Sequence, residues 1–453
     1  MKHQLSAWVL SGLFMLCMSA CKDNAEDTTG AFDPSQPVEI TEFSPKNGSF
    51  KTRLYIYGKN FGNDVSQISV TIGGLPAKVV GSDGEIIYCL VPKRAVGGTI
   101  EVTIGESANA TAPGKFQYES KTIVSTVAGY ISPTGTKEVK DGAFADCGFE
   151  GPRNLVVDPK NKKHIYMIDG MGLSIRLLDF ETNTVTTVLT RGQGGWDNIR
   201  QLTFTRSADT LLIANERNVA NGLAVSYVTR QNGFKRPQNL VWMQRNNTCT
   251  IHPINGELYY NCRDNGNLFR YDFGTNTSET LYPIQTRDCQ FFIFFHPSGD
   301  YAYFTVPNKK YIYKAEYDWD NKTLKVANTF AGNGSEGWQD GQGTNARLGN
   351  PMQGCFVKNE TYVKEGKSDI YDFYFADQNS HCIRYLTPEG FVFTFAGRGS
   401  TGVNSNPYGY IDGDLLKEAR FNQPVGITYD EENKTFYIGD ANNSRIRMIE
   451  MDE

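Results

Sequence analysis

Short segments in which apolar and polar side chains alternate predict β-strands over residues 37–119. The segment RLYIYG places Leu54 and Ile56 on one face of a strand, and ISVTIGG and TIEVTIG repeat this period of two. Clusters of Gly, Asn and Pro separate these runs, and they show no helical period. The pattern predicts a β-sandwich for this part of the chain.

Residues 37–119 resemble the IPT/TIG immunoglobulin-like domain. The motifs that carry the resemblance are ITEFSPKNGS, LYIYGKNFG, VTIGGLPAKVV, IIYCLVP and GKFQYE. Within the second motif, Gly58 and Gly62 allow positive φ at a corner between strand and loop. The resemblance implies a spacer or interaction module without catalytic residues.

A repeated unit fills residues 120–453. The shared pattern begins with Asp-Gly, followed by an apolar residue and Pro before a first, apolar strand. A polar turn leads to a second strand that ends in Asp. An Asn-rich loop then leads to a third strand that contains Ile-Arg. Clear copies start at Asp141, Asp340 and Asp412, and three weaker units lie between the first two. These copies resemble the NHL repeat, whose fold is a β-propeller. Six units predict a six-bladed, all-β propeller, with seven blades as the alternative count.

The segment IVSTVAG, residues 123–129, is the outer strand of a unit but has no unit in front of it. Near-copies end at Gly332 (VANTFAG) and Gly397 (FVFTFAG), where each closes a blade. The last unit stops at RIRMIEMDE and lacks a fourth strand. We therefore expect IVSTVAG to pair with residues 446–449 and to close the ring, which removes two exposed sheet edges.

The first 21 residues have the pattern of a signal peptide. A positive start precedes a charge-free apolar run that ends in MSAC, which resembles a bacterial lipobox with Cys21 as the lipid-bearing residue. Cleavage near Ala20 without lipid is the alternative. Residues 22–36 are polar and acidic and predict a flexible tether. This segment resembles the surface-export signal of Bacteroidetes lipoproteins, which implies a lipid-anchored protein exposed at the outer membrane.

Charge and cysteine content narrow the possible functions. The net charge of −5 argues against a nucleic-acid-binding protein. Besides Cys17 and Cys21, seven cysteines remain without a C-x-x-C pair, so a zinc ribbon or dense disulfide framework is not expected. A turn at Asn255-Gly256 would place Cys249 opposite Cys262, as either a disulfide or two buried thiols.

We find no catalytic constellation, metal site or cofactor motif in the sequence. Of the five histidines, His252 and His296 occupy a turn between two strands, where a turn-capping role is expected. Asp169, Asp377 and Asp440 recur before short loops and are expected to cap them, with calcium binding as the alternative. The lack of a nucleophile or metal-ligand motif favours a protein that is not an enzyme.

The candidate ligand site is the propeller face at which the inner strands begin. Amide and guanidinium groups there can pair with sugar hydroxyls or carboxylates, and flat aromatic rings on the same face would stack on sugars. The predicted ligand-binding residues are Arg153, Arg200, Gln201, Asn247, Gln353, Trp196, Trp338 and Tyr410. Packing between blades is the alternative role for the aromatic residues, and simple solvation for the polar ones.

The combination of lipobox, acidic tether, IPT/TIG domain and propeller resembles accessory surface lipoproteins of polysaccharide-utilisation systems. It implies a non-enzymatic protein that binds a polysaccharide or oligosaccharide. A scaffold that docks an outer-membrane transporter or a host protein is the second hypothesis. A propeller lyase or hydrolase is the third.

Overall fold

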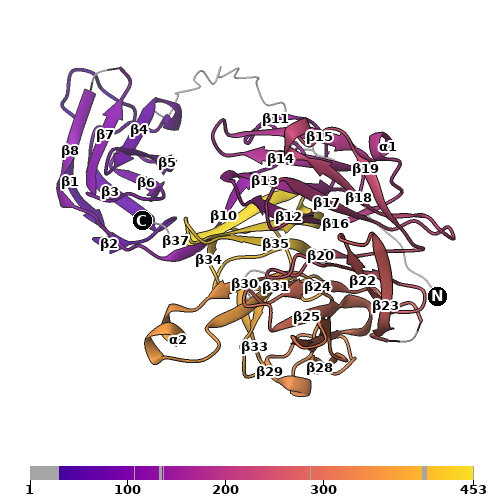
Figure 1. Ribbon diagram of the computed structural model, residues 1–453. Helices are drawn as coiled ribbons and strands as arrows, with labels where there is room; N and C mark the ends of the chain where they lie inside the picture. Colours follow the sequence, from indigo (N-terminus) through magenta and orange to yellow (C-terminus); the bar gives the residue numbers. More distant parts are fainter. Residues whose placement is uncertain are drawn as a thin grey trace, which may run out of the picture. The chain divides into compact units, whose positions relative to one another are not determined.

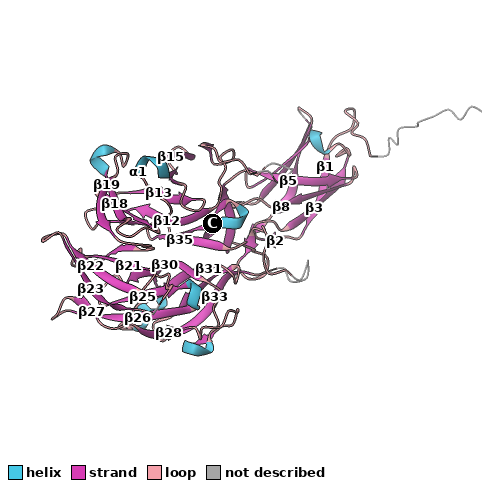
Figure 2. Cartoon of the chain, turned by 90° about the vertical axis from the view of Figure 1, so that its right-hand side faces the viewer, coloured by secondary structure: helices cyan, strands magenta, loops and turns pink. Residues whose placement is uncertain are grey.

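The computed structural model describes residues 30–106, 108–131, 135, 137–285, 287–399 and 406–451. The chain divides between Glu119 and Ser120 into two compact units. Both are built from β-strands, and the two α-helices of the described residues, α1 (Arg191–Gly194) and α2 (Glu360–Glu365), are short (Figures 1 and 2). Among the residues described, no helix is long and apolar enough to cross a membrane. The predicted signal peptide, Cys21 and residues 22–29 lie outside the described part.

The first unit is the predicted β-sandwich. Its main sheet has, in spatial order, β1 (Glu39–Ser44), β3 (Arg53–Lys59), β6 (Ile86–Leu90), β5 (Leu75–Ser82), β4 (Ile68–Ile72), β7 (Thr99–Ile104) and β8 (Ala108–Lys115). A small parallel pair, β2 (Asn47–Gly48) with β9 (Gln117–Tyr118), adds to it. The alternation in β3 holds, since Leu54 and Ile56 are fully buried in the core.

The corner after β3 uses its residues differently from the prediction. Asn60 and Gly62 have positive φ, of 61° and 77°, but Gly58 does not. Gly58 instead lies against β1, where a Cβ would come within 2.0 Å of the Glu39 carbonyl oxygen. Asn60 also donates through Nδ2 to the carbonyls of Asp33 and Gln36. The last residues assigned to the tether are thus held against the sandwich.

The second unit is a six-bladed propeller in which each blade is a sheet of antiparallel strands. The first blade consists of β12 (Pro152–Asp158), β13 (Asn161–Asp169), β14 (Ser174–Asp179) and β15 (Thr184–Thr190). The second consists of β16 (Ile199–Phe204), β17 (Thr210–Asn215), β18 (Leu223–Thr229) and β19 (Gln238–Trp242). The third consists of β20 (Cys249–Ile251), β21 (Leu258–Cys262), β22 (Asn267–Asp272) and β23 (Thr277–Pro283). The fourth blade consists of β24 (Phe292–Phe295), β25 (Tyr301–Val306), β26 (Tyr311–Asp318) and β28 (Asn328–Ala331). The fifth consists of β30 (Pro351–Lys358), β31 (Tyr371–Asp377), β32 (Cys382–Leu386) and β33 (Phe391–Gly397). The inner strands contact one another in a closed ring, β12–β16–β20–β24–β30–β35 (Figure 1).

The sixth blade is closed by the strand that precedes the first blade. It consists of β35 (Pro424–Asp430), β36 (Thr435–Asp440), β37 (Arg445–Met451) and β10 (Thr122–Ala128). Strand β10 is antiparallel to β37, with Val124 opposite Ile449 and Ala128 opposite Ile446. The predicted ring closure is therefore confirmed, and the two ends of the propeller sequence share one sheet.

The repeated Asp-Gly, Asp and Ile-Arg positions form one buried ion-pair unit. In the sixth blade, Arg447 donates to Asp440 Oδ2 at 2.8 Å and to Asp412 Oδ1 at 2.6 Å, and it has no exposed surface. Asp412 in turn accepts from the backbone N–H and the hydroxyl of Thr126 in β10. The same unit recurs as Arg176 with Asp169 and Asp141, and as Arg384 with Asp377 and Asp340.

The aspartates that end the second strands have a second role that the sequence did not reveal. Asp169 and Asp377 accept backbone N–H groups of the loop that enters the inner strand, at Gly151 and Asn350. Capping is thus combined with an ion pair to a buried arginine. The turn-capping interpretation also holds for His252, whose Nδ1 accepts from the N–H groups of two turn residues.

The cysteines of the described residues are free thiols. Strands β20 and β21 form the predicted hairpin, but Cys249 lies opposite Tyr260, two residues away from Cys262. The register therefore does not place the two sulfur atoms across from each other, and the disulfide alternative is wrong.

Candidate ligand pocket at the mouth of the propeller channel

Polar side chains on the inner strands join neighbouring blades around the channel. Asn154 Oδ1 on β12 accepts from the N–H of Leu202 on β16 at 2.9 Å. Gln201 Oε1 on β16 accepts from the N–H of Cys249 on β20 at 3.1 Å. Gln201, a predicted ligand residue, is buried and serves this bridge instead.

Gln353 on β30 bridges three inner strands of the channel. Its Oε1 accepts from the N–H of Ile427 at 3.2 Å and of Leu155 at 2.9 Å, and its Nε2 donates to the Leu155 carbonyl at 2.6 Å. The side chain thus reaches past β35 to β12. This crossing is possible because Gly426 lets β35 approach β12 closely, and a Cβ there would lie 1.5 Å from the Arg153 carbonyl oxygen.

We expect Gly426→Ala to destabilise the propeller by about 1–3 kcal/mol, the usual cost of forcing a methyl group into a packed interior. The added Cβ must push β35 away from β12 and strain the Gln353 bridge. Chemical denaturation followed by tryptophan fluorescence measures this, because apart from Trp8 every tryptophan lies in the propeller. Gly192→Ala is the matched control, since a Cβ there meets nothing within 4 Å. Equal stability of the two variants would contradict the close approach.

Above Gln353, a pocket opens at the start of the inner strands. It is small, with a volume of about 30 Å³, and five of the six inner strands contribute to it. Its polar lining is Arg153, Asn154, Asn198, Arg200 and Gln353, and its apolar lining is Met171, Ile199, Phe292, Met352 and Val425. Two guanidinium groups therefore face an apolar floor, and no acidic residue of the described part lines the pocket.

Arg153 and Arg200 hold the same position in adjacent blades, each one residue before a bridging amide. Arg200 lies near Glu216, with Nε 3.5 Å from Oε2. No hydrogen bond or ion pair of Arg153 is found among the described residues, and its Nε is buried without an acceptor. Burial lowers the pKa of both arginines, against opposing effects of Asp169 on Arg153 and Glu216 on Arg200.

Two further arginines, Arg245 and Arg263, lie beside Glu216. Its Oε1 accepts from Arg263 at 3.0 Å and lies 3.5 Å from Arg245 Nε. Arg245 and Arg263 are in turn paired with Asp264 and Asp288. The positive charge of these two arginines is neutralised locally, whereas Arg153 keeps its charge available at the pocket.

Asn247 occupies the corresponding position in the third blade but does not line the pocket. It is completely buried, and neither its Oδ1 nor its Nδ2 has a hydrogen-bond partner among the described residues. Its backbone N–H donates to Asn261 Oδ1 at 2.7 Å. Asn247 therefore has the repeat position of Arg153 and Arg200, but its side chain is buried in the interior and does not reach the pocket.

The predicted aromatic platform does not form. Trp196 is only 4% exposed and donates through Nε1 to Ser226 Oγ at 2.7 Å within the core of the second blade. Trp338 and Tyr410 are half-exposed but lie at the outer strands β33 and β10, next to Thr394 and Thr126. Arg398 and Arg445 stack on these two rings, with guanidinium carbons 4.0 Å and 3.8 Å from the ring centroids.

Sequence reasoning missed the apolar side of the pocket. Phe292, Met352 and Val425 are apolar residues at the start of inner strands, where the pattern reads as ordinary core. A comparison of the repeat units at the position of Arg153 would have found Met352 and Val425. Met171 comes from the loop between β13 and β14 and carries no sequence signal.

The opposite end of the channel is a wider cavity of about 380 Å³ lined by all six inner strands. Phe204, Phe294 and Phe356 are among its walls, and it contains no described His, Asp or Glu. Its single thiol, Cys355, has a pKa raised by burial, so the thiolate is disfavoured. Neither end of the channel holds a general acid and base in the part of the chain described.

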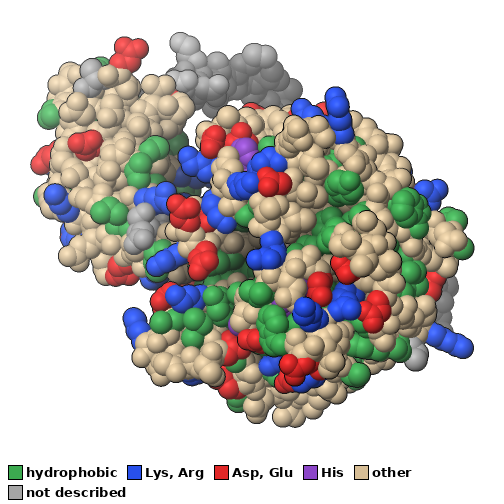
Figure 3. All heavy atoms as spheres, in the orientation of Figure 1, with side chains coloured by type: hydrophobic (Ala, Val, Ile, Leu, Met, Phe, Trp, Pro, Cys, Tyr) green, Lys and Arg blue, Asp and Glu red, His purple; other side chains and the backbone are tan. Residues whose placement is uncertain are grey.

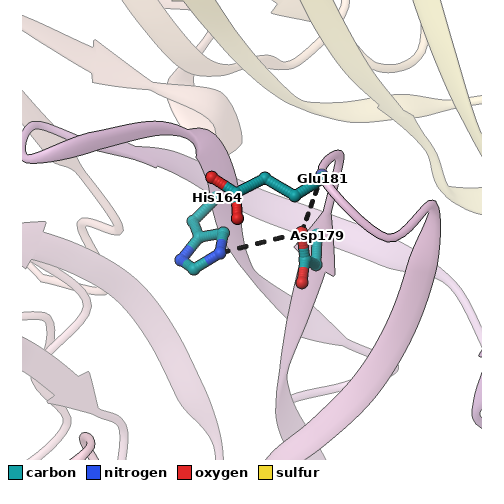
Figure 4. Close-up of side chains that lie close together, drawn as sticks. All are labelled: His164, Asp179 and Glu181. Atoms are coloured by element: carbon teal, nitrogen blue, oxygen red, sulfur yellow. Dashed lines mark hydrogen bonds and ion pairs between the residues drawn. The ribbon is translucent and has the colours of Figure 1, made fainter.

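One group of possible cation ligands lies at the surface of the first blade. His164, Asp179 and Glu181 approach one another between β13 and the turn after β14 (Figure 4). Asp179 already accepts the backbone N–H of Glu181 at 2.8 Å, and His164 is its cross-strand neighbour. These contacts are those of a β-hairpin turn, and they account for the cluster without a metal.

The face shown in Figure 3 carries interspersed acidic and basic side chains without a basic stripe. An IPT/TIG domain, followed in sequence by a strand-closed propeller of NHL type with a small cationic pocket at its channel mouth, defines the class of this protein. The IPT/TIG family matches residues 37–118.

The chain belongs to a family of Bacteroides proteins of this two-domain construction. It is 46% identical to a Bacteroides thetaiotaomicron VPI-5482 protein described as an auxiliary nutrient binding protein, with a TM-score of 0.75 over 94% of this chain and 100% of that one. A second auxiliary nutrient binding protein, from Bacteroides ovatus, is 36% identical with a TM-score of 0.70 over 93% and 100% of the chains. A protein of Bacteroides thetaiotaomicron described as a putative phosphatase is 35% identical, with a TM-score of 0.73 over 94% and 99%.

Curated relatives confirm the NHL character of the repeats. NHL repeat-containing protein 2 of Gallus gallus is 24% identical over 332 residues, and SUPPRESSOR OF QUENCHING 1 of Arabidopsis thaliana is 24% identical over 350 residues. These alignments cover 69% and 71% of this chain. The chain spans only 40% and 27% of the length of those two relatives.

Proposed function

We propose that this protein is a non-enzymatic accessory protein that binds a nutrient glycan in the pocket at the mouth of the propeller channel. The carrying observation is the pocket itself, which combines two guanidinium groups, an amide and an apolar floor. Polar groups that fix orientation above an apolar surface are the general form of a small-ligand site. The similarity to two auxiliary nutrient binding proteins supports the same role.

The lack of acid and base groups in the channel supports binding without turnover. Most glycoside hydrolases use a pair of carboxyl groups beside the scissile bond. Neither end of the channel offers one among the described residues. The relative described as a putative phosphatase makes turnover of a phosphate ester the reaction to exclude in parallel.

The proposed setting is the outer surface of the outer membrane. Lipid on Cys21 would anchor the chain, and the IPT/TIG domain would act as a spacer for the propeller. An outer-membrane transporter is the partner that such an accessory protein would serve. Loss of a labelled fatty acid from the Cys21→Ser variant tests the anchor.

Affinity electrophoresis and calorimetry against a panel of neutral and acidic polysaccharides and oligosaccharides test the glycan proposal. We expect at least one glycan to bind, and an Arg153→Ala/Arg200→Ala variant to lose at least about tenfold in affinity. The Trp338→Ala/Tyr410→Ala variant is the control and should bind like the native protein, because these rings lie away from the pocket. Binding to no member of the panel would refute the proposal, and loss in the control alone would move the site to the propeller rim.

A further inference from the structure

We propose that the pocket recognises a carboxylate, so that its ligand is an acidic sugar such as a hexuronic acid residue at a chain end. This inference rests on the proposed function and names the ligand class of the same site. It follows from the charge of the pocket and from the distribution of ion-pair partners among its arginines.

The charge of the pocket is positive and incompletely balanced. Arg153 and Arg200 both line it, and the described lining contains no carboxylate. Glu216 approaches Arg200, but it is shared with Arg245 and Arg263. A half-buried guanidinium without an acceptor is costly to maintain, and a bound carboxylate would supply the missing charge and acceptors.

Arg153 is the residue best placed for this contact. Arg245 and Arg263 hold acidic partners at 2.7 Å and 2.6 Å, whereas Arg153 has none among the described residues. A guanidinium presents two parallel N–H groups that match both oxygens of a carboxylate, which a neutral hydroxymethyl group cannot satisfy.

The rest of the pocket offers apolar contacts to the sugar that carries the carboxylate. Phe292, Met352 and Val425 form an apolar floor against which the C–H face of a sugar ring can pack. The pocket volume of about 30 Å³ suits the carboxylate group itself, so the sugar ring would lie at the pocket mouth. Gln353 lines both this pocket and the cavity at the other end of the channel, and its bridge across three inner strands favours entry of a chain end from the mouth over passage of a polymer.

A pair of ligands that differ only at the carboxylate tests the inference on the full-length protein. Galacturonic acid oligosaccharides and galactose oligosaccharides of equal length and linkage provide that pair. We expect the uronate to bind at least about tenfold more tightly at low salt, and this preference to shrink as salt rises. Arg153→Gln should abolish the preference. Arg153→Lys should keep part of it, because lysine retains the positive charge but lacks the two parallel N–H donors of the guanidinium.

The outcomes separate this inference from the proposed function. Equal affinity for the two oligosaccharides, or tighter binding of the neutral one, would overturn the carboxylate inference and leave glycan binding intact. Binding of neither, nor of any polysaccharide in the panel, would overturn both. Arg398→Gln, at the outer rim, is the matched control and should leave the preference unchanged, and melting temperatures verify that each variant is folded.

Discussion

Replacing residues 121–129 by a Gly/Ser linker of equal length is expected to prevent the propeller from folding. Strand β10 contributes the buried side chains of Ile123 and Val124, each worth about 1.5–3 kcal/mol, and the full hydrogen-bond ladder to β37. It also supplies the Thr126 contacts to Asp412. Together these losses approach the total stability of a typical domain, about 5–15 kcal/mol. Loss of the cooperative tryptophan-fluorescence transition is the measurement.

Adding the same nine residues after Glu453 should restore the propeller. Thr122 lies opposite Met451, so the start of β10 is next to the end of β37. A short Gly-rich turn can therefore join them as a hairpin. Recovery of the transition in this rearranged chain would show that the strand itself, and not its place in the sequence, is required. A linker variant that unfolds like the native protein would contradict ring closure.

Arg447→Met is expected to destabilise the propeller by about 3–5 kcal/mol at neutral pH. The substitution leaves the carboxylates of Asp440 and Asp412 without their shared cation, and an unpaired buried charge carries a cost of this size. Urea denaturation at pH 7.5 measures the loss. Arg445→Met on the same strand is the control and should cost much less, because Arg445 has no acidic partner among the described residues and stacks on a half-exposed ring.

The loss caused by Arg447→Met should shrink as the pH falls. Burial raises the pKa of Asp440 and Arg447 opposes that rise, so removal of the arginine raises the pKa of the folded state further. A carboxyl group with a raised folded pKa stabilises the protein below its unfolded pKa of about 3.9 and destabilises it as the pH rises through the folded value. The variant should therefore lie closer to the native protein at pH 5 than at pH 7.5. Adding Asp440→Asn should recover part of the loss, and a loss independent of pH would contradict this account.

Much of the fold was accessible from the sequence because its signals are local and repeated. Alternation in β3 predicts the sandwich core, and the six recurring units predict six blades. The orphan IVSTVAG segment predicts the closing strand, since its resemblance to later outer strands identifies its place in a blade.

The site was predicted less well, because side-chain direction near a channel depends on contacts between blades. Arg153, Arg200 and Gln353 do line the pocket, as expected for the starts of inner strands. Gln201 turns to bridge two blades, and Asn247 is withdrawn into the interior. Arg153, Arg200 and Asn247 share one repeat position, and Gln201 and Gln353 share the next, so residues at one position have different outcomes that no pattern within a strand distinguishes.

The sequence by itself thus determined the strands, the blade count, the closing segment and the starting positions of the inner strands. The tertiary structure alone decided which polar groups are used between blades and which remain available, and it moved the aromatic residues out of the candidate site. Trp196 shows the reason. A large apolar ring gains most by burial, and only the packing of neighbouring strands decides whether a core position is within its reach.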